Sequence, residues 1–218
     1  MSKKNKLNTN DYKGKKLVAF DLYGTCIHRQ KPFFGKWFSF WKELKTILET
    51  NPIDFDQINW GKIEFDWKIF KLKNWDIKNI KKDIAWILLY PDFEGVIEYL
   101  KSKWYKTAVV SNLAKPYEKP MRNLIPEWSF DYEALSFNAW ATKPNPEIFE
   151  YLKNLSWLEF NEMILVWDSL RSDIKWANDV WIKPIHINRW HKTLPENTKK
   201  DWIEFIQIST LDQLKTIL

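Results

Sequence analysis

From residue 91 to the end of the chain, short apolar runs alternate with amphipathic segments, and this alternation limits the fold more than any other feature. We predict helices over 92–103, 117–124, 145–156, 172–180 and 212–218, and strands over 17–21, 105–111, 132–137, 163–166, 183–187 and 205–208. Strands that alternate with helices of about 10–12 residues are typical of βαβ units. The pattern therefore predicts an α/β fold with a doubly wound, parallel sheet.

The composition is that of a globular protein. Of the 218 residues 45% are hydrophobic and 28% are charged, which excludes a disordered chain. The longest apolar run, 85–90, is too short to cross a bilayer, and residues 1–16 form a polar tail without the apolar region of a signal peptide. The one cysteine, Cys26, excludes an internal disulfide. We expect a cytoplasmic protein with no membrane partner.

The net charge of +6 raises the possibility of a nucleic-acid partner. Only four of the 34 basic residues are arginines, however, and bidentate contacts to bases and phosphates favour arginine. We interpret the lysines as a solvated surface and predict no nucleic-acid partner. The sequence does not reveal the oligomeric state.

Residues whose side chains can bind a ligand or take part in catalysis follow several of the predicted strands. Because ligands bind at the carboxyl ends of parallel strands, we expect these residues to converge at one edge of the sheet. They are Asp21 and Thr25 after the first strand, Ser111 and Asn112 after the second, Lys143 before the helix 145–156, and Asp168 and Asp173 after the strand 163–166.

This set suits phosphoryl transfer with an aspartyl nucleophile. Asp21 and Asp168 offer the oxygen ligands that Mg²⁺ prefers. Lys143 can neutralise the nucleophile and the phosphate, while Ser111 or Thr25 can donate hydrogen bonds to phosphate oxygens. Asn112, next to Ser111, is a further candidate for binding the substrate.

The order of these residues resembles the motifs of the haloacid dehalogenase-like (HAD) hydrolase superfamily. The matching segments are Phe-Asp-Leu-Tyr-Gly-Thr at 20–25, Val-Ser-Asn at 110–112, Thr-Lys-Pro-Asn-Pro-Glu-Ile-Phe at 142–149 and Val-Trp-Asp-Ser-Leu-Arg-Ser-Asp at 166–173. The resemblance implies that Asp21 is the nucleophile, that Ser111 binds phosphate, and that the acidic residues of the last segment hold Mg²⁺ together with the main-chain carbonyl of Tyr23.

The resemblance also implies the domain organisation. A Rossmann-like core would comprise 17–27 and 92–218, and a mainly helical cap, 28–91, would close over the site and select the substrate. On this reading the chain is a Mg²⁺-dependent phosphatase of a small phosphorylated metabolite.

One departure leaves the chemistry open. Phosphatases of this superfamily usually carry a second Asp two residues after the nucleophile, whereas this chain has Tyr23, which is common in dehalogenases. Dehalogenases use no metal and usually lack the acidic residue at position 168. The alternatives are therefore a metal-free 2-haloacid dehalogenase or a non-catalytic binding protein for phosphorylated metabolites. Without the second Asp, a proton for the leaving group would come from water or from His28, unless the substrate has a good leaving group.

The chain has 15 tryptophans and 5 glycines, although average usage predicts about 15 glycines. Trp104, Trp157 and Trp181 end predicted helices, where a left-handed backbone favours glycine and a Cβ costs about 1–2 kcal/mol. Trp167 and Trp176 stand where the superfamily usually has glycine. We hypothesise that most of these residues are encoded by UGA codons that the source organism reads as glycine. The alternative is a protein that is rich in tryptophan in its core and cap.

Overall fold

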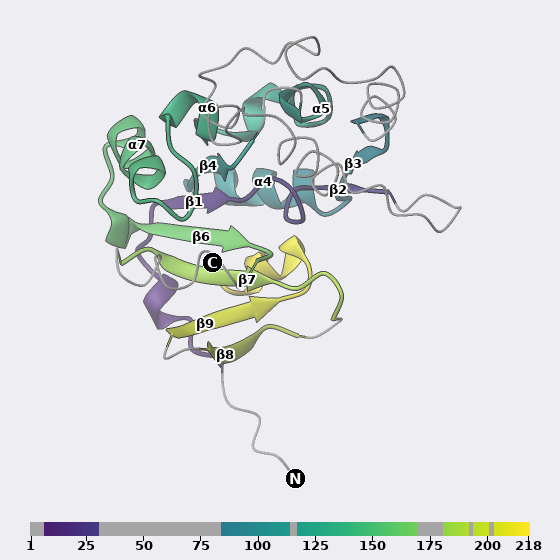
Figure 1. Ribbon diagram of the computed structural model, residues 1–218. Coiled ribbons are helices and arrows are strands. Elements are labelled where there is room, and N and C mark those ends of the chain that lie inside the picture. The colour runs from purple at the N-terminus through teal and green to yellow at the C-terminus, as the bar shows by residue number, and fades with distance from the viewer. Residues whose placement is uncertain (1–6, 31–83, 114–116, 170–180, 192–193, 201–202) are drawn as a thin grey trace, which may run out of the picture.

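The computed structural model describes residues 7–30, 84–113, 117–169, 181–191, 194–200 and 203–218. Among these residues, seven strands form one sheet with the order β5-β4-β1-β6-β7-β9-β8 (Figure 1). The parallel strands are β1 (Leu17–Phe20), β4 (Lys106–Ser111), β5 (Tyr132–Leu135), β6 (Met163–Trp167), β7 (Lys183–Ile187) and β9 (Ile203–Ile208), and β8 (Glu196–Lys200) runs antiparallel to β9.

Strand β1 lies inside the sheet and is buried on both faces. Phe20 pairs with Val109 of β4 and with Val166 of β6, so the first residue after β1 lies beside the ends of two other strands. Val18 and Phe20 pack in one hydrophobic cluster, and Leu17 and Ala19 pack in another. Alternate side chains of a strand point to opposite faces, so the two clusters are the two sides of the sheet.

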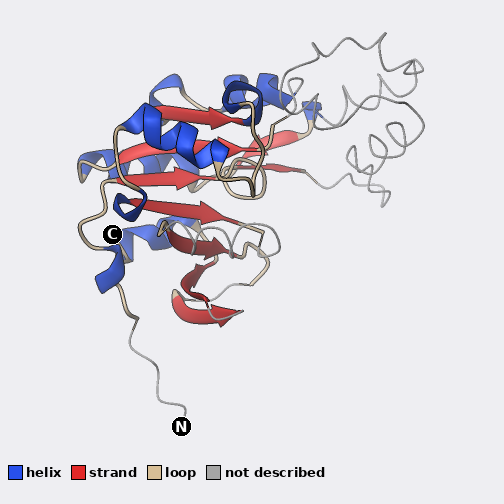
Figure 2. Ribbon diagram, turned by 60° about the vertical axis from the view of Figure 1, so that its left-hand side comes forward, coloured by secondary structure: helices blue, strands red, loops and turns tan. Residues whose placement is uncertain are grey.

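Helices cover both faces of the sheet. The cluster around Phe20 includes residues of α4 (Phe93–Ser102), α5 (Glu118–Leu124) and the 3₁₀ helix η5 (Leu211–Thr216). The cluster around Ala19 includes residues of α7 (Glu147–Ser156). This arrangement confirms the predicted Rossmann-like, doubly wound sheet, and Figure 2 shows the helices on its two sides.

Two predicted elements differ in detail. The strand predicted over 132–137 ends at Leu135, and Ser136 begins the short helix α6 (Ser136–Ala139), where its hydroxyl accepts a hydrogen bond from the main-chain N–H of Leu113. The closing helix predicted over 212–218 is the 3₁₀ helix η5. The edge strand β8 escaped prediction because its five residues are all polar. The helix predicted over 172–180 lies outside the described residues.

Residues 7–16 are not the polar tail that the sequence suggested. Asn10–Tyr12 form the 3₁₀ helix η1, and the Tyr12 side chain is buried against β7 and β9. Its hydroxyl donates to the main-chain carbonyl of Pro184 at 2.7 Å and accepts from the N–H of Ile206 at 3.1 Å. One aromatic residue therefore attaches this polar segment to the core. Further 3₁₀ turns are η3 (Glu127–Ser129) and η4 (Phe160–Glu162).

The segment predicted as a cap, 28–91, leaves and rejoins the core through a pair of short antiparallel strands. They are β2 (Ile27–Arg29) and β3 (Ile87–Leu89), with Ile27 opposite Leu89. Residues 31–83, the greater part of the predicted cap, lie outside the described residues, so the helical cap stays a prediction. In the described part of the chain, no helix combines the length and apolar character needed to span a membrane.

Candidate active site

Asp21 and Lys143 form a buried ion pair at the carboxyl edge of the sheet. Asp21 directly follows β1, and its main-chain N–H donates to the carbonyl of Val166 at 2.9 Å. The Lys143 Nζ lies 2.7 Å from the Asp21 Oδ1, and the two side chains are 6% and 16% exposed. Buried charges need such a partner, because desolvation otherwise favours their neutral forms. The structure thus brings together the predicted nucleophile and the predicted cation.

Asn112 fixes the main chain of Lys143. Its Oδ1 accepts a hydrogen bond from the Lys143 N–H at 2.6 Å, and its Nδ2 donates to the Lys143 carbonyl at 2.8 Å. The sequence placed Asn112 among the substrate-binding residues. In the structure its amide group holds the segment that carries the lysine.

The two predicted phosphate-binding hydroxyls are both buried. Ser111 is the last residue of β4, next to β1 in the sheet, and is 2% exposed. Thr25 is fully buried, and its Oγ1 has no hydrogen-bond partner among the described residues. A buried hydroxyl without a partner costs about 1–3 kcal/mol, so the Thr25 hydroxyl retains its hydrogen-bonding capacity at a cost to stability.

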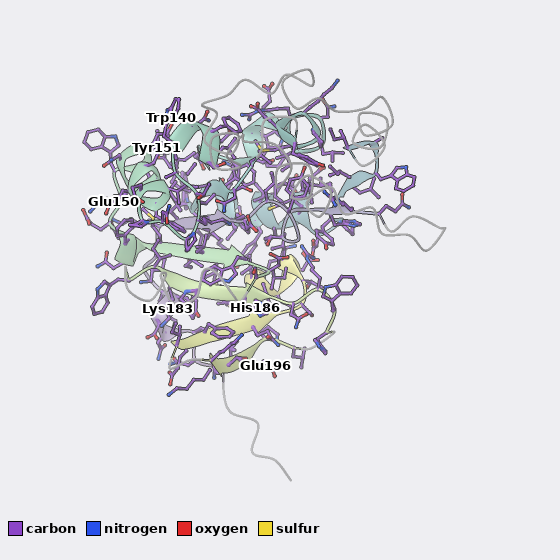
Figure 3. The ribbon with its side chains drawn as sticks, in the orientation of Figure 1. Trp140, Glu150, Tyr151, Lys183, His186 and Glu196 are labelled. Atoms are coloured by element: carbon purple, nitrogen blue, oxygen red, sulfur yellow. The ribbon has the colours of Figure 1, made fainter. Side chains whose placement is uncertain are left out.

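Asp168 packs against the turn that follows Asp21. Gly24 in this turn has a φ of +85°, and a Cβ at this residue would lie 2.0 Å from the Asp168 Oδ2. Only glycine fits there, both for its backbone and for the space. The main-chain carbonyl of Asp168 lies 3.1 Å from the Nε2 of His186, a residue of β7 that is labelled in Figure 3. Asp168 therefore lies close to the turn that begins with Asp21, at the edge of the sheet where the sequence predicted it.

A cavity of about 330 Å³ opens beside this turn. Tyr23 and Asp168 line it from the core, and His28 and Tyr90 line it from the ends of the predicted cap segment. The His28 ring stacks on the Tyr90 ring with 4.3 Å between their centroids. The Tyr23 hydroxyl donates to the main-chain carbonyl of Tyr117 at 3.3 Å. The cavity is large enough for a small metabolite.

Arg189 is a part of this site that the sequence analysis missed. Its guanidinium donates to the Asp92 Oδ2 and to the main-chain carbonyl of Thr25, both at 2.6 Å, and lies 3.7 Å from the centroid of the Tyr90 ring. It thereby connects the turn before the predicted cap with the residues after it. A signal was present, since Arg189 is one of only four arginines and follows the end of β7.

Cys26 lies beneath the same turn and is not a second nucleophile. Its thiol is fully buried and donates to the main-chain carbonyl of Asp21 at 3.2 Å. Burial raises the pKa of the Cys26 thiol well above its ordinary value, with the nearby Asp21 carboxylate adding to the effect. The thiol therefore stays protonated and supports the turn.

The donors near Asp21 are of the kind that Mg²⁺ prefers. Asp21 and Asp168 offer carboxylate oxygens, and the turn that follows Asp21 includes Tyr23, whose main-chain carbonyl is the further ligand that the resemblance implies. Asp173, the third predicted acidic ligand, lies outside the described residues. Within the described ranges, no group of three or more His, Cys, Asp or Glu side chains is placed to hold a metal ion.

Comparison with known proteins identifies the fold. No protein-family model and no curated protein matches the sequence. Among solved structures, an HAD phosphatase from Thermococcus onnurineus is 23% identical, with a TM-score of 0.62 over 93% of this chain and 97% of that one. A 2-haloacid dehalogenase from Pseudomonas syringae pv. Tomato is 17% identical, with a TM-score of 0.64 over 93% and 97%.

A third similar structure contains ligands. It is an HAD family enzyme from Bacteroides thetaiotaomicron in complex with magnesium and inorganic phosphate, 19% identical, with a TM-score of 0.63 over 82% of this chain and 96% of that one. The chain therefore has the HAD-like fold, as its four motifs predicted. Solved structures of both phosphatases and dehalogenases share this fold.

Proposed function

We propose that this protein is an HAD-type hydrolase, a Mg²⁺-dependent phosphatase that acts on a small phosphorylated metabolite through an aspartyl-phosphate. The observation that carries the proposal is the buried ion pair between Asp21 and Lys143, with Asp168 packed against the turn that follows Asp21. A carboxylate, a cation and a second carboxylate at the carboxyl edge of a parallel sheet form a suitable site for phosphoryl transfer.

The reaction would begin with an attack of the Asp21 carboxylate on phosphorus. A bond forms between an Asp21 oxygen and phosphorus, and the bond between phosphorus and the leaving-group oxygen breaks. Lys143 holds the carboxylate in place and offsets the negative charge that approaches it. Water then attacks the phosphorus, which releases inorganic phosphate and restores the Asp21 carboxylate.

Mg²⁺ would be held by the carboxylates of Asp21 and Asp168 and by the main-chain carbonyl of Tyr23, with Asp173 as a further acidic ligand. When bound, it would neutralise charge on the transferring phosphoryl group. The Thr25 and Ser111 hydroxyls, both at the same edge of the sheet, would donate hydrogen bonds to phosphate oxygens.

The leaving group needs a proton that Tyr23 is not placed to supply, since its hydroxyl donates to the carbonyl of Tyr117. His28 lines the cavity, and histidine is the residue type that most often serves as a general acid in enzymes. Water or His28 would therefore protonate the leaving oxygen, and substrates with good leaving groups would react fastest.

A second candidate is a metal-free 2-haloacid dehalogenase, which the Tyr at position 23 favours. In that reaction the Asp21 carboxylate displaces a halide from carbon, and water hydrolyses the resulting ester. Asp168 argues against this candidate, because a second carboxylate has a clear use only where a cation is bound.

One assay separates the candidates. The purified protein is given p-nitrophenyl phosphate with Mg²⁺ or with EDTA and, separately, 2-chloropropionate, with Asp21→Asn as the control variant. We expect Mg²⁺-dependent release of p-nitrophenol that the control lacks. Halide release that ignores EDTA supports the dehalogenase instead. Turnover of neither substrate contradicts both activities and favours a binding protein.

A further inference from the structure

Four tryptophans have a left-handed backbone. The φ angles of Trp104, Trp140, Trp157 and Trp181 are +66°, +54°, +57° and +68°. In the described part of the chain, every residue other than glycine with a positive φ is a tryptophan. Such angles are uncommon outside glycine, asparagine and aspartate, and for a bulky residue they are outliers. A set made up of one bulky residue type therefore needs a common cause.

These tryptophans occupy turns in which glycine is the usual residue. At the end of α4 the N–H of Trp104 donates to the carbonyl of Lys101, and the N–H of Tyr105 donates to the carbonyl of Leu100, both at 3.0 Å. This pair of bonds is the Schellman motif, in which the residue at the place of Trp104 is usually glycine. Trp140 and Trp157 end α6 and α7 in the left-handed conformation.

The indole rings provide no compensation for the unfavourable backbone. Trp104 and Trp157 are each 92% exposed, Trp181 is 78% exposed and Trp140, labelled in Figure 3, is 57% exposed. A side chain in water gains little from burial, so packing does not explain why a large ring occupies each turn.

The other tryptophans behave differently and serve as internal controls. Trp128 lies in the 3₁₀ helix η3, and its φ is not positive. Trp167, which stands where the superfamily usually has glycine, is the last residue of β6, fully buried and without a positive φ, so the argument from the backbone does not extend to it. Its Nε1 has no hydrogen-bond partner among the described residues. Trp176 lies outside them.

We propose that positions 104, 140, 157 and 181 are glycine in the natural protein, encoded by UGA codons that its ribosomes read as glycine. One codon assignment accounts for all four turns, whereas independent selection of an exposed indole at each turn has no physical basis here. Trp140, which the sequence analysis did not single out, joins the set on its backbone alone. The proposal does not depend on the hydrolase activity.

Thermal unfolding tests the physical part of the proposal. Trp104→Gly and Trp157→Gly should each raise the Tm by about 2–8 °C, because glycine removes the penalty of a Cβ at positive φ. Trp104→Ala and Trp157→Ala keep the Cβ and should change the Tm by no more than about 2 °C. Trp128→Gly, the matched control at a negative φ, should lower the Tm by about 1–4 °C.

If the chain with tryptophan at all four positions does not fold, the variant with glycine at all four becomes the reference, and tryptophan is restored at one position at a time. Each restoration should then lower the Tm. Glycine variants that are no more stable than the matching alanine variants would overturn the structural argument.

The gene and the natural protein give the closing test. We expect UGA at codons 104, 140, 157 and 181, and peptide mass spectrometry of protein from the natural source should show glycine at all four positions. A UGG codon, or tryptophan by mass, at any of these positions overturns the proposal.

Discussion

The two edges of the central sheet make different demands on the sequence. At the carboxyl edge, contacts made by specific side chains hold the site together. Lys143 pairs with Asp21, Asn112 holds Lys143, and Arg189 joins Thr25 to Asp92. At the opposite edge, the turns before β4, β6 and β7 need mainly a left-handed backbone. Chemistry depends on residue identity at the first edge, and folding depends on backbone conformation at the second. Substitution of Asp21 or Lys143 at the first edge should thus change turnover, that of Arg189 should change the stability of the site, and substitutions at the second edge should change stability alone.

The largest effect is expected at the nucleophile. Asp21→Asn should lower turnover of p-nitrophenyl phosphate by several orders of magnitude, because an amide does not form the acyl phosphate. The measurement is the steady-state rate together with the circular dichroism spectrum, which should show a folded protein. Asp131→Asn, the same change at the opposite edge, should leave the rate unaltered. Substantial activity in Asp21→Asn removes this residue from the mechanism.

The next largest effect concerns the ion pair between Arg189 and Asp92, whose side chains are 11% and 10% exposed. Arg189→Met should lower the free energy of unfolding by about 3–5 kcal/mol, because it leaves a buried carboxylate without its partner. Denaturant titration measures this loss.

Arg122→Met is the matched control for that experiment. The Arg122 side chain is 47% exposed in its ion pair with Glu133, so its loss should cost no more than about 1 kcal/mol. Equal losses in the two variants would show that burial does not increase the contribution of the Arg189 ion pair to the free energy of unfolding.

A smaller effect is expected at Tyr23. Tyr23→Asp restores the acidic residue that phosphatases of this superfamily usually carry, and it should raise the rate by about tenfold for substrates with poor leaving groups. Rates with alkyl phosphates and with p-nitrophenyl phosphate should be compared, since the good leaving group needs less help. An unchanged or lower rate would mean that Tyr23 has a positioning role of its own.

The smallest effect lies at the opposite edge, at Asp131. Burial works to raise the pKa of Asp131, but hydrogen bonds from the Thr107 N–H and from Lys101 outweigh it and lower the pKa below 3.8. Asp131→Asn should therefore cost about 1 kcal/mol of stability at neutral pH.

The pH dependence of that difference follows from the lowered pKa. The carboxylate contributes its full stability above pH 3.8 and loses it as the pH falls through the lower pKa of the folded state. The difference between wild type and variant in urea titrations should therefore shrink below pH 3.8. A difference that is constant with pH would rule out the charge as its source.

The sequence carried enough information to predict the sheet, because buried parallel strands appear as continuous apolar runs such as 163–166. It also predicted that Asp21, Lys143 and Asp168 lie together at one edge of the sheet, because each lies within a motif with fixed neighbours. It failed for β8, whose residues are polar, and for Tyr12, whose burial depends on main-chain partners in β7 and β9, far away in the sequence. Arg189 was missed for a related reason, since its partners lie before and after the predicted cap. The role of Asn112 depends on its two hydrogen bonds to Lys143, which only the folded chain reveals.

The central claim is that Asp21 carries the phosphoryl group, and a rapid-quench experiment tests it most directly. The protein is mixed with p-nitrophenyl phosphate and Mg²⁺, quenched in acid within a single turnover, and the peptide that contains Asp21 is analysed by mass spectrometry. We predict a phosphoryl group on Asp21, which hydroxylamine removes, and no such adduct in Asp21→Asn. Turnover without any adduct on Asp21 would contradict this account. So would transfer of heavy oxygen from labelled water into the Asp21 carboxylate during turnover of 2-chloropropionate, which is the signature of ester hydrolysis in a dehalogenase.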